Sequence, residues 1–218
     1  MWTGLPTRPA LAALALLSFP ATAVADRGAL TLEGGPALTL GGVSPSQGEG
    51  STTLARGGGA SLGVRYALSN ALELAVTALW EAPAEYFLAG VTMGSASGSV
   101  RGTLSERVQR LGALGGVHYV RGYVWRLHLG AEIGWMREAF SRRDLLDVAD
   151  PANVHSFGLG LQDRTIDSLV LAPVAGIEWQ LSDHWSVSVL PRVEFLLGGT
   201  SRVGILVPVS VGYSWYFL

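Results

Sequence analysis

The sequence predicts an all-β protein that folds as an eight-stranded, antiparallel, up-and-down β-barrel. From Ala29 onward, apolar residues recur at every second position, whereas a helix would place them three and four positions apart. The chain contains 29 glycines and only 15% charged residues, a composition that suits twisted strands and tight turns better than helices. The segments between the alternating runs are short and long in turn, as in a barrel whose strands run up and down.

Eight runs carry this alternation, and most reach the roughly 9–11 residues that a tilted strand needs to cross a membrane. They cover residues 29–40, 60–68, 72–80, 111–119, 123–135, 169–179, 185–195 and 203–217. Successive residues of a strand point to opposite faces, so each run has one apolar face and one polar or small face. No stretch of the chain is apolar for the roughly 20 residues of a membrane-spanning helix. We therefore expect a transmembrane barrel.

The connections between the runs sort by length. They are long at 43–57, 83–105 and 137–164, short at 69–71, 120–122 and 182–184, and of medium length at 198–202. Barrels of the bacterial outer membrane have short periplasmic turns, long extracellular loops and, with an even number of strands, both termini in the periplasm. We expect the same orientation here. A soluble, lipocalin-like barrel is the alternative, but its connections need not sort in this way.

Aromatic residues mark both ends of the predicted apolar face. Near the expected periplasmic boundary lie Tyr66, Tyr119, Tyr123, Trp125, Trp179, Trp185, Tyr213 and Trp215, and near the outer boundary lie Trp80, Trp135 and Phe195. Amphipathic rings concentrate at the two interfaces of a membrane. The pattern therefore favours a barrel in the outer membrane of a Gram-negative bacterium.

The first 25 residues have the pattern of a secretory signal peptide. A single charge, Arg8, precedes an apolar run over residues 10–19, which is too short to cross a bilayer. Pro20 ends that run, and Ala23-Val24-Ala25 forms a small-x-small cleavage site. We predict a signal peptide at residues 1–25 and a barrel domain at residues 26–218.

The C-terminus carries alternating aromatic residues, Tyr213, Trp215 and Phe217. This ending resembles the assembly signature of bacterial outer-membrane barrels, although that signature ends on the aromatic itself and this chain adds Leu218. With the signal pattern and the strands, it resembles the small OmpA/OmpX/Opa-like class rather than one member. The resemblance implies three partners: the barrel-assembly machinery, outer-membrane lipids and lipopolysaccharide.

Charged residues occupy the predicted inward face, and they are the candidate functional residues. They are Glu33, Arg65, Glu73, Arg110, His118, Arg126, His128, Glu132, Glu178, Arg192 and Glu194. Side chains nearly fill an eight-stranded barrel, and buried charges must be paired. We expect an Arg–Glu network that plugs the barrel. A gated path for ions or protons through that network, with His128 titrating near neutral pH, is the alternative.

Catalytic, metal and cofactor sites are not predicted. The chain has no cysteine, and its formal charge of −2 provides no basic surface for nucleic acid. His155 and Ser156 are adjacent, so they would face opposite ways in a strand, and the spacing of Asp144, Asp147 and Asp150 does not match a calcium-binding loop. We therefore expect a structural or surface-interaction role. The alternatives are a lipid A-modifying outer-membrane enzyme and a narrow transport pore, and the oligomeric state stays open.

Apolar residues within the long connections 83–105 and 137–164 suggest hairpins that project above the membrane. Phe157, Leu159 and Leu161 keep the outward parity of Leu169, which favours an extension of that strand. A projecting sheet edge could bind partners by strand addition.

Overall fold

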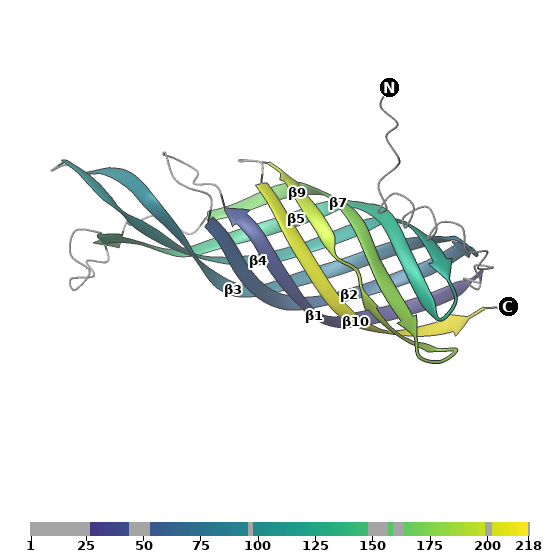
Figure 1. Ribbon diagram of the computed structural model, residues 1–218. Helices are drawn as coiled ribbons and strands as arrows, with labels where there is room; N and C mark the ends of the chain where they lie inside the picture. Colours follow the sequence, from purple (N-terminus) through teal and green to yellow (C-terminus); the bar gives the residue numbers. More distant parts are fainter. Residues whose placement is uncertain are drawn as a thin grey trace, which may run out of the picture.

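The structure, a computed structural model, describes residues 27–43, 53–95, 98–147, 157–158, 164–198 and 202–217 (Figure 1). Within these ranges the regular elements are all strands: β1 (Ala29–Val43), β2 (Thr53–Ser69), β3 (Leu72–Ser95), β4 (Gly98–Gly122), β5 (Trp125–Asp147), β6 (Phe157–Gly158), β7 (Arg164–Gln180), β8 (Trp185–Val189), β9 (Arg192–Leu197) and β10 (Arg202–Tyr216). A search of the same ranges finds no helix with the length and hydropathy to cross a membrane. The predicted signal peptide lies outside the described residues.

The strands close into an antiparallel ring. From β1 to β5 each strand pairs with the next along the chain, and β5 pairs with β7. β1 pairs with β10 to close the barrel, from Ala29 opposite Tyr216 to Gly41 opposite Gly204. β8 and β9 both pair with β7 and β10, so they occupy one position in the ring. The two-residue β6 lies against β5 outside the ring. The predicted eight-stranded barrel is confirmed.

Prolines explain why the run at residues 185–195, predicted as one strand, is divided into β8 and β9. The break falls at Leu190 and Pro191, and proline has no backbone N–H to donate to a ladder. Pro36 in β1 and Pro173 in β7 coincide with gaps in the β1–β10 and β7–β9 ladders. The barrel wall is therefore irregular where these strands adjoin, although the ring remains closed.

The turn between β4 and β5 lies at Tyr123 and Val124, slightly later than the predicted turn at 120–122. Gly122 precedes it with φ +123°, in the region that side-chain-bearing residues rarely adopt. A Cβ there would lie 1.9 Å from the carbonyl oxygen of Trp125. Glycine at this position therefore allows the tight turn.

Three strands continue beyond the barrel. The β2–β3 ladder ends at Gly59 opposite Glu81, and the β5–β7 ladder ends at Phe140 opposite Arg164. β3, β4 and β5 remain paired past these points and form a sheet that projects from the end of the barrel opposite the C-terminus (Figure 1). The hairpin suggested within 83–105 is present, since β3 and β4 stay paired up to Ser95 opposite Gly98. The start of the long connection predicted at 137–164 instead belongs to β5. The alternation fades there because a strand outside the barrel has no continuous apolar face to maintain.

The predicted extension of β7 through Phe157, Leu159 and Leu161 is not what the structure shows at residue 157. Phe157 belongs to β6, which pairs with β5 opposite Leu145, and β7 begins at Arg164. Leu159 and Leu161 lie outside the described residues.

The two faces of the barrel differ sharply in chemistry. Large apolar side chains on the outer face are exposed, and Val76, for example, retains 62% of its accessible surface. The side chains of the inner face are mostly buried. The apolar core lies inside the barrel and comprises Ala37, Leu79, Leu114, Met136, Val170, Ala172, Leu196 and Leu206. The exposed outer face therefore has the chemistry of a protein interior.

Candidate functional site: the charged lumen

All the predicted inward residues lie on the inner face of the barrel. They share this face because side chains two positions apart on a strand point to the same side of the sheet. Ten are buried, namely Glu33, Arg65, Glu73, Arg110, His118, His128, Glu132, Glu178, Arg192 and Glu194, and Arg126 is partly buried near the turn that joins β4 to β5. They form three groups along the barrel.

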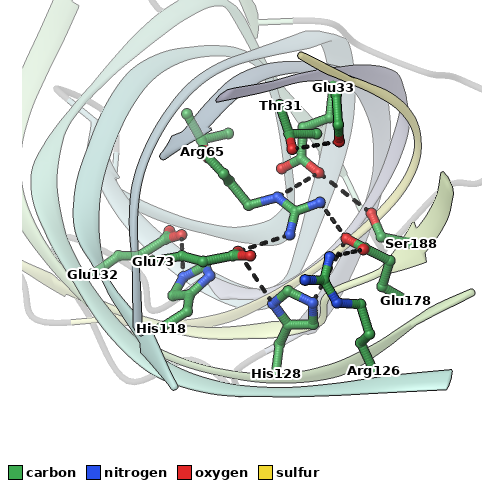
Figure 2. A network of polar contacts seen from close by, with 12 residues as sticks. Thr31, Glu33, Arg65, Glu73, His118, Arg126, His128, Glu132, Glu178 and Ser188 are labelled. Atoms are coloured by element: carbon green, nitrogen blue, oxygen red, sulfur yellow. Dashed lines mark hydrogen bonds and ion pairs between the residues drawn. The ribbon is translucent and has the colours of Figure 1, made fainter. Parts of the chain in front are cut away.

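The first group, the Arg65 cluster, lies near the C-terminus, because Arg65 is opposite Thr31 on β1 and Thr31 is opposite Ser214 on β10. Figure 2 shows its side chains. Arg65 on β2 donates to three carboxylates: its Nε to Glu33 at 3.1 Å, its Nη1 to Glu73 at 2.9 Å, and its Nη2 to Glu178. Arg126 donates to the other oxygen of Glu178 at 3.0 Å. The guanidinium has five N–H donors in a fixed plane, so it can join carboxylates from three different strands.

His128 lies beside this cluster. Its Nδ1 is 3.9 Å from Glu73 and its Nε2 is 3.6 Å from Glu178, both too long for hydrogen bonds. Its ring meets that of His118 edge-to-face, with centroids 6.1 Å apart. The imidazole therefore packs among charged groups without a hydrogen bond of its own.

The second group, the Arg192 cluster, is built around one carboxylate on β5. Arg192 contacts both oxygens of Glu132, through Nε at 2.7 Å and Nη2 at 3.0 Å, and also donates to the Thr77 hydroxyl at 3.1 Å. Nε2 of His118 lies 3.0 Å from Glu132. Glu132 thus has a guanidinium and an imidazole as partners.

The third group, the Arg110 cluster, lies toward the projecting sheet. Arg110 donates from Nε to Glu138 at 3.0 Å, and its Nη1 lies 3.6 Å from Glu81. Glu194 faces the same region from β9, with electrostatic interactions to Glu81 and Arg110. The structure therefore adds two carboxylates, Glu81 and Glu138, to the predicted set.

The sequence contained a signal for both missed residues. Glu81 has the parity of Glu73 on the same strand, and Glu138 has the parity of Glu132. The predicted strands ended at Trp80 and Trp135, one residue before Glu81 and three residues before Glu138, although β3 and β5 continue to Ser95 and Asp147. Extending the alternation beyond the aromatic residues would have found them.

Glycines provide the space for the large inward side chains. A Cβ on Gly130 would lie 2.5 Å from Cδ2 of His118, and one on Gly116 would lie 2.8 Å from Cγ of Glu132. Each large side chain thus covers a glycine on the next strand. This packing explains why a barrel with a filled lumen uses so many glycines.

Apolar residues separate the Arg192 and Arg110 clusters. Leu79 lies between Thr77 and Glu81 along β3, and Met136 lies between Glu132 and Glu138 along β5. Both apolar side chains are at most 2% exposed. On the far side of the Arg110 cluster, Val108 on β4 lies directly opposite Phe140 on β5, and both side chains are buried. The described lumen is therefore closed by apolar side chains on both sides of the Arg110 cluster.

The residues weighed for catalysis or metal binding lie in a different part of the chain. His155, Ser156 and Asp150 lie outside the described residues, and Asp144 and Asp147 belong to β5 near the tip of the projecting sheet. In the part of the chain that the structure describes, no group of three or more histidine, aspartate or glutamate side chains could hold a metal ion.

The fold and the lumen together define a class: a small eight-stranded barrel with an apolar exterior and a charged, packed interior. Three solved structures share this fold. The attachment invasion locus protein Ail of Yersinia pestis matches with a TM-score of 0.51 and 14% identity over 87% of this chain and 99% of Ail. Neisserial surface protein A matches with a TM-score of 0.52 and 14% identity over 88% of this chain and 100% of that protein. The outer membrane protein OprG of Pseudomonas aeruginosa matches with a TM-score of 0.51 and 13% identity over 88% of this chain and 97% of OprG.

No protein-family model matches the sequence, and neither does any curated protein. At these identities the structural likeness shows the fold alone. The predicted resemblance to small outer-membrane barrels is confirmed at that level.

Proposed function

We propose that this chain is an integral protein of the bacterial outer membrane, in which a closed barrel anchors a β-sheet that contacts partners at the cell surface. The observation that carries the proposal is the exposed apolar outer face. Monomeric soluble proteins rarely expose apolar patches of more than a few hundred Å². Here the exposed apolar residues extend around the barrel on β1, β2, β3, β4, β5, β7, β9 and β10.

The height of the apolar band supports a membrane location. On β5 the band runs from Trp125 to Trp135, about 33 Å along a strand that rises about 3.3 Å per residue. A strand tilt of about 40° reduces this to a height of about 25 Å, the typical value for outer-membrane barrels. Just past Trp135, Arg137 pairs with Asp167 at 2.9 Å on the outer face. Charge therefore returns where the hydrocarbon layer would end.

The opposite rim also has the character of a membrane interface. Trp125 stacks on Trp179 with centroids 5.4 Å apart, and Trp185 meets Tyr213 at 4.9 Å. Tyr213 belongs to the C-terminal aromatic pattern, which supports recognition by the barrel-assembly machinery. With this rim and both termini in the periplasm, the projecting sheet lies outside the cell, within reach of lipopolysaccharide.

Two features favour surface interaction over transport. The described lumen is filled by the three charged clusters and closed by apolar side chains, which is unfavourable for a pore. Beyond Glu81, β3 pairs only with β4 among the described residues, so no described strand covers its other edge. Open strand edges bind partners by strand addition. Two proteins with this fold, Ail and Neisserial surface protein A, are named for attachment or for the cell surface.

The absence of native cysteine allows a direct test of orientation. Ser95→Cys places a thiol at the tip of the projecting sheet, and Ser182→Cys places one in the short turn between β7 and β8. A membrane-impermeant maleimide is applied to intact cells and to cells with a permeabilised outer membrane. We expect Ser95→Cys to react in both and Ser182→Cys only after permeabilisation.

The opposite labelling pattern, or a protein recovered in the soluble periplasm without a heat-dependent gel shift, would contradict the proposal. Planar-bilayer recording of the folded protein separates an anchor from a pore. We expect no conductance, and steady single-channel currents would support transport instead.

A further inference from the structure

Glu194 is a fully buried carboxylate that no described side chain contacts as an ion pair. Its exposed fraction is 0%, and neither carboxylate oxygen has a hydrogen-bond partner in the part of the chain that the structure describes. Glu33, by contrast, accepts a hydrogen bond from Arg65 at 3.1 Å. Burying an ionised carboxylate without a partner is strongly unfavourable. Such a group therefore usually lies beside a cation or binds a proton.

The groups that face Glu194 do not supply that charge. Glu81 on β3 and Glu132 on β5 repel its negative charge, while Arg110 on β4 and Arg192 on its own strand attract it. Each arginine already contacts a nearer carboxylate: Arg192 contacts Glu132 at 2.7 Å, and Arg110 contacts Glu138 at 3.0 Å. On β10, Gly204 faces Glu194 with no side chain at all.

Counting charges across the described lumen gives the same result. The described acidic side chains are Glu33, Glu73, Glu81, Glu132, Glu138, Glu178 and Glu194, and the described basic ones are Arg65, Arg110, Arg126, Arg192, His118 and His128. Even with both histidines charged, one carboxylate of this set is left over. Glu194 is the carboxylate left over, since it has no cationic group within 4 Å among the described side chains.

A metal ion is a poor source of the missing charge. Hard cations such as calcium require six to eight oxygen ligands. The described residues contain no group of three or more side chains suited to hold a metal ion. Gly204, which faces Glu194 from β10, contributes no side-chain ligand. A proton needs neither ligands nor additional space.

From this geometry we propose that Glu194 is a proton-binding site within the lumen and that it remains a neutral carboxylic acid in the folded barrel at neutral pH. The bound proton removes one buried negative charge from the part of the lumen that holds the Arg110 cluster, between the two sets of apolar side chains. Its loss at alkaline pH leaves an uncompensated carboxylate beside Glu81, and the repulsion between the two carboxylates destabilises the barrel. This inference concerns the lumen and does not depend on the proposed surface role.

Infrared spectroscopy of the folded barrel in detergent micelles tests this proposal, because the carbonyl stretch of a protonated carboxyl is separate from the carboxylate bands. Glu194→Gln replaces the acid with a neutral group of the same shape. Glu33→Gln is the matched control, since Glu33 is also buried but pairs with Arg65. We expect the wild type at neutral pH to show a carboxylic acid band that is lost in Glu194→Gln and retained in Glu33→Gln.

Unfolding in urea provides a second readout. The wild type should lose stability as the pH rises above neutral, whereas Glu194→Gln should lose markedly less. The absence of the acid band from the wild type at neutral pH, or its persistence in Glu194→Gln, would overturn the proposal. A wild-type stability that follows sodium, potassium or calcium concentration at fixed pH would also overturn it, because a metal ion would then be the counter-charge.

Discussion

Replacing Arg65 with methionine should strongly destabilise the barrel. Arg65 is 2% exposed and contacts Glu33, Glu73 and Glu178. Methionine fills much of the same volume but carries no charge. Glu178 would keep Arg126 as a partner at 3.0 Å, whereas Glu33 and Glu73 would lose the guanidinium that now neutralises them.

The expected loss follows from the burial of the pairs. Removing one partner of a buried ion pair costs about 3–5 kcal/mol, because the remaining charge stays in a medium of low polarity. Two carboxylates are affected here, so we expect Arg65→Met to lower the free energy of unfolding by at least about 3 kcal/mol. Arg65→Lys should cost less, since an ammonium retains the charge, but it cannot contact three carboxylates in one plane.

Urea unfolding in lipid vesicles, followed by tryptophan fluorescence, measures this loss. Arg137→Met is the matched control, because Arg137 pairs with Asp167 in a salt bridge whose side chains are 50% and 45% exposed. Solvent screens such a pair, so the control should barely change stability. Adding Glu33→Gln and Glu73→Gln to Arg65→Met should recover part of the loss. Equal effects of Arg65→Met and Arg137→Met would refute the reasoning.

Two further predictions concern packing and the membrane interface. Gly130→Val should cost about 1–3 kcal/mol in the same assay, because the added atoms collide with His118, and overpacking a filled interior carries that penalty. Gly58→Ala, where the nearest atom to a new Cβ is 4.0 Å away, should be tolerated, and a similar loss in both glycine variants would contradict the packing argument. Trp125→Ala should cost about 1 kcal/mol through loss of the stacking on Trp179, and an unchanged urea midpoint would show that the stack contributes nothing.

Much of the architecture follows from a local property of strands. Side chains alternate between faces regardless of what the strand pairs with, so alternation alone assigned residues such as Arg65 and Glu178 to the interior. The aromatic ends of the runs also indicated where the apolar band stops. They did not indicate where the strands stop, and for that reason Glu81 and Glu138 were missed.

The alternation of apolar and polar residues could not predict the projecting sheet. Residues 83–95 and 98–105 form backbone ladders between β3 and β4, yet their sequence has no continuous apolar face. Backbone hydrogen bonds can extend a hairpin whatever the side chains are. The hydrophobic pattern therefore located the barrel and underestimated the length of its strands.

The sequence by itself determined which residues line the lumen, since that depends only on position along each strand. Only the tertiary structure decided which of them meet. Arg65 and Glu178 are separated by 113 residues and lie on β2 and β7, and their level within the barrel depends on how the strands tilt and how their registers shift when the ring closes. For the same reason, Glu33 contacts a guanidinium, whereas Glu194 contacts none of the described ones, although both are inward glutamates on alternating strands.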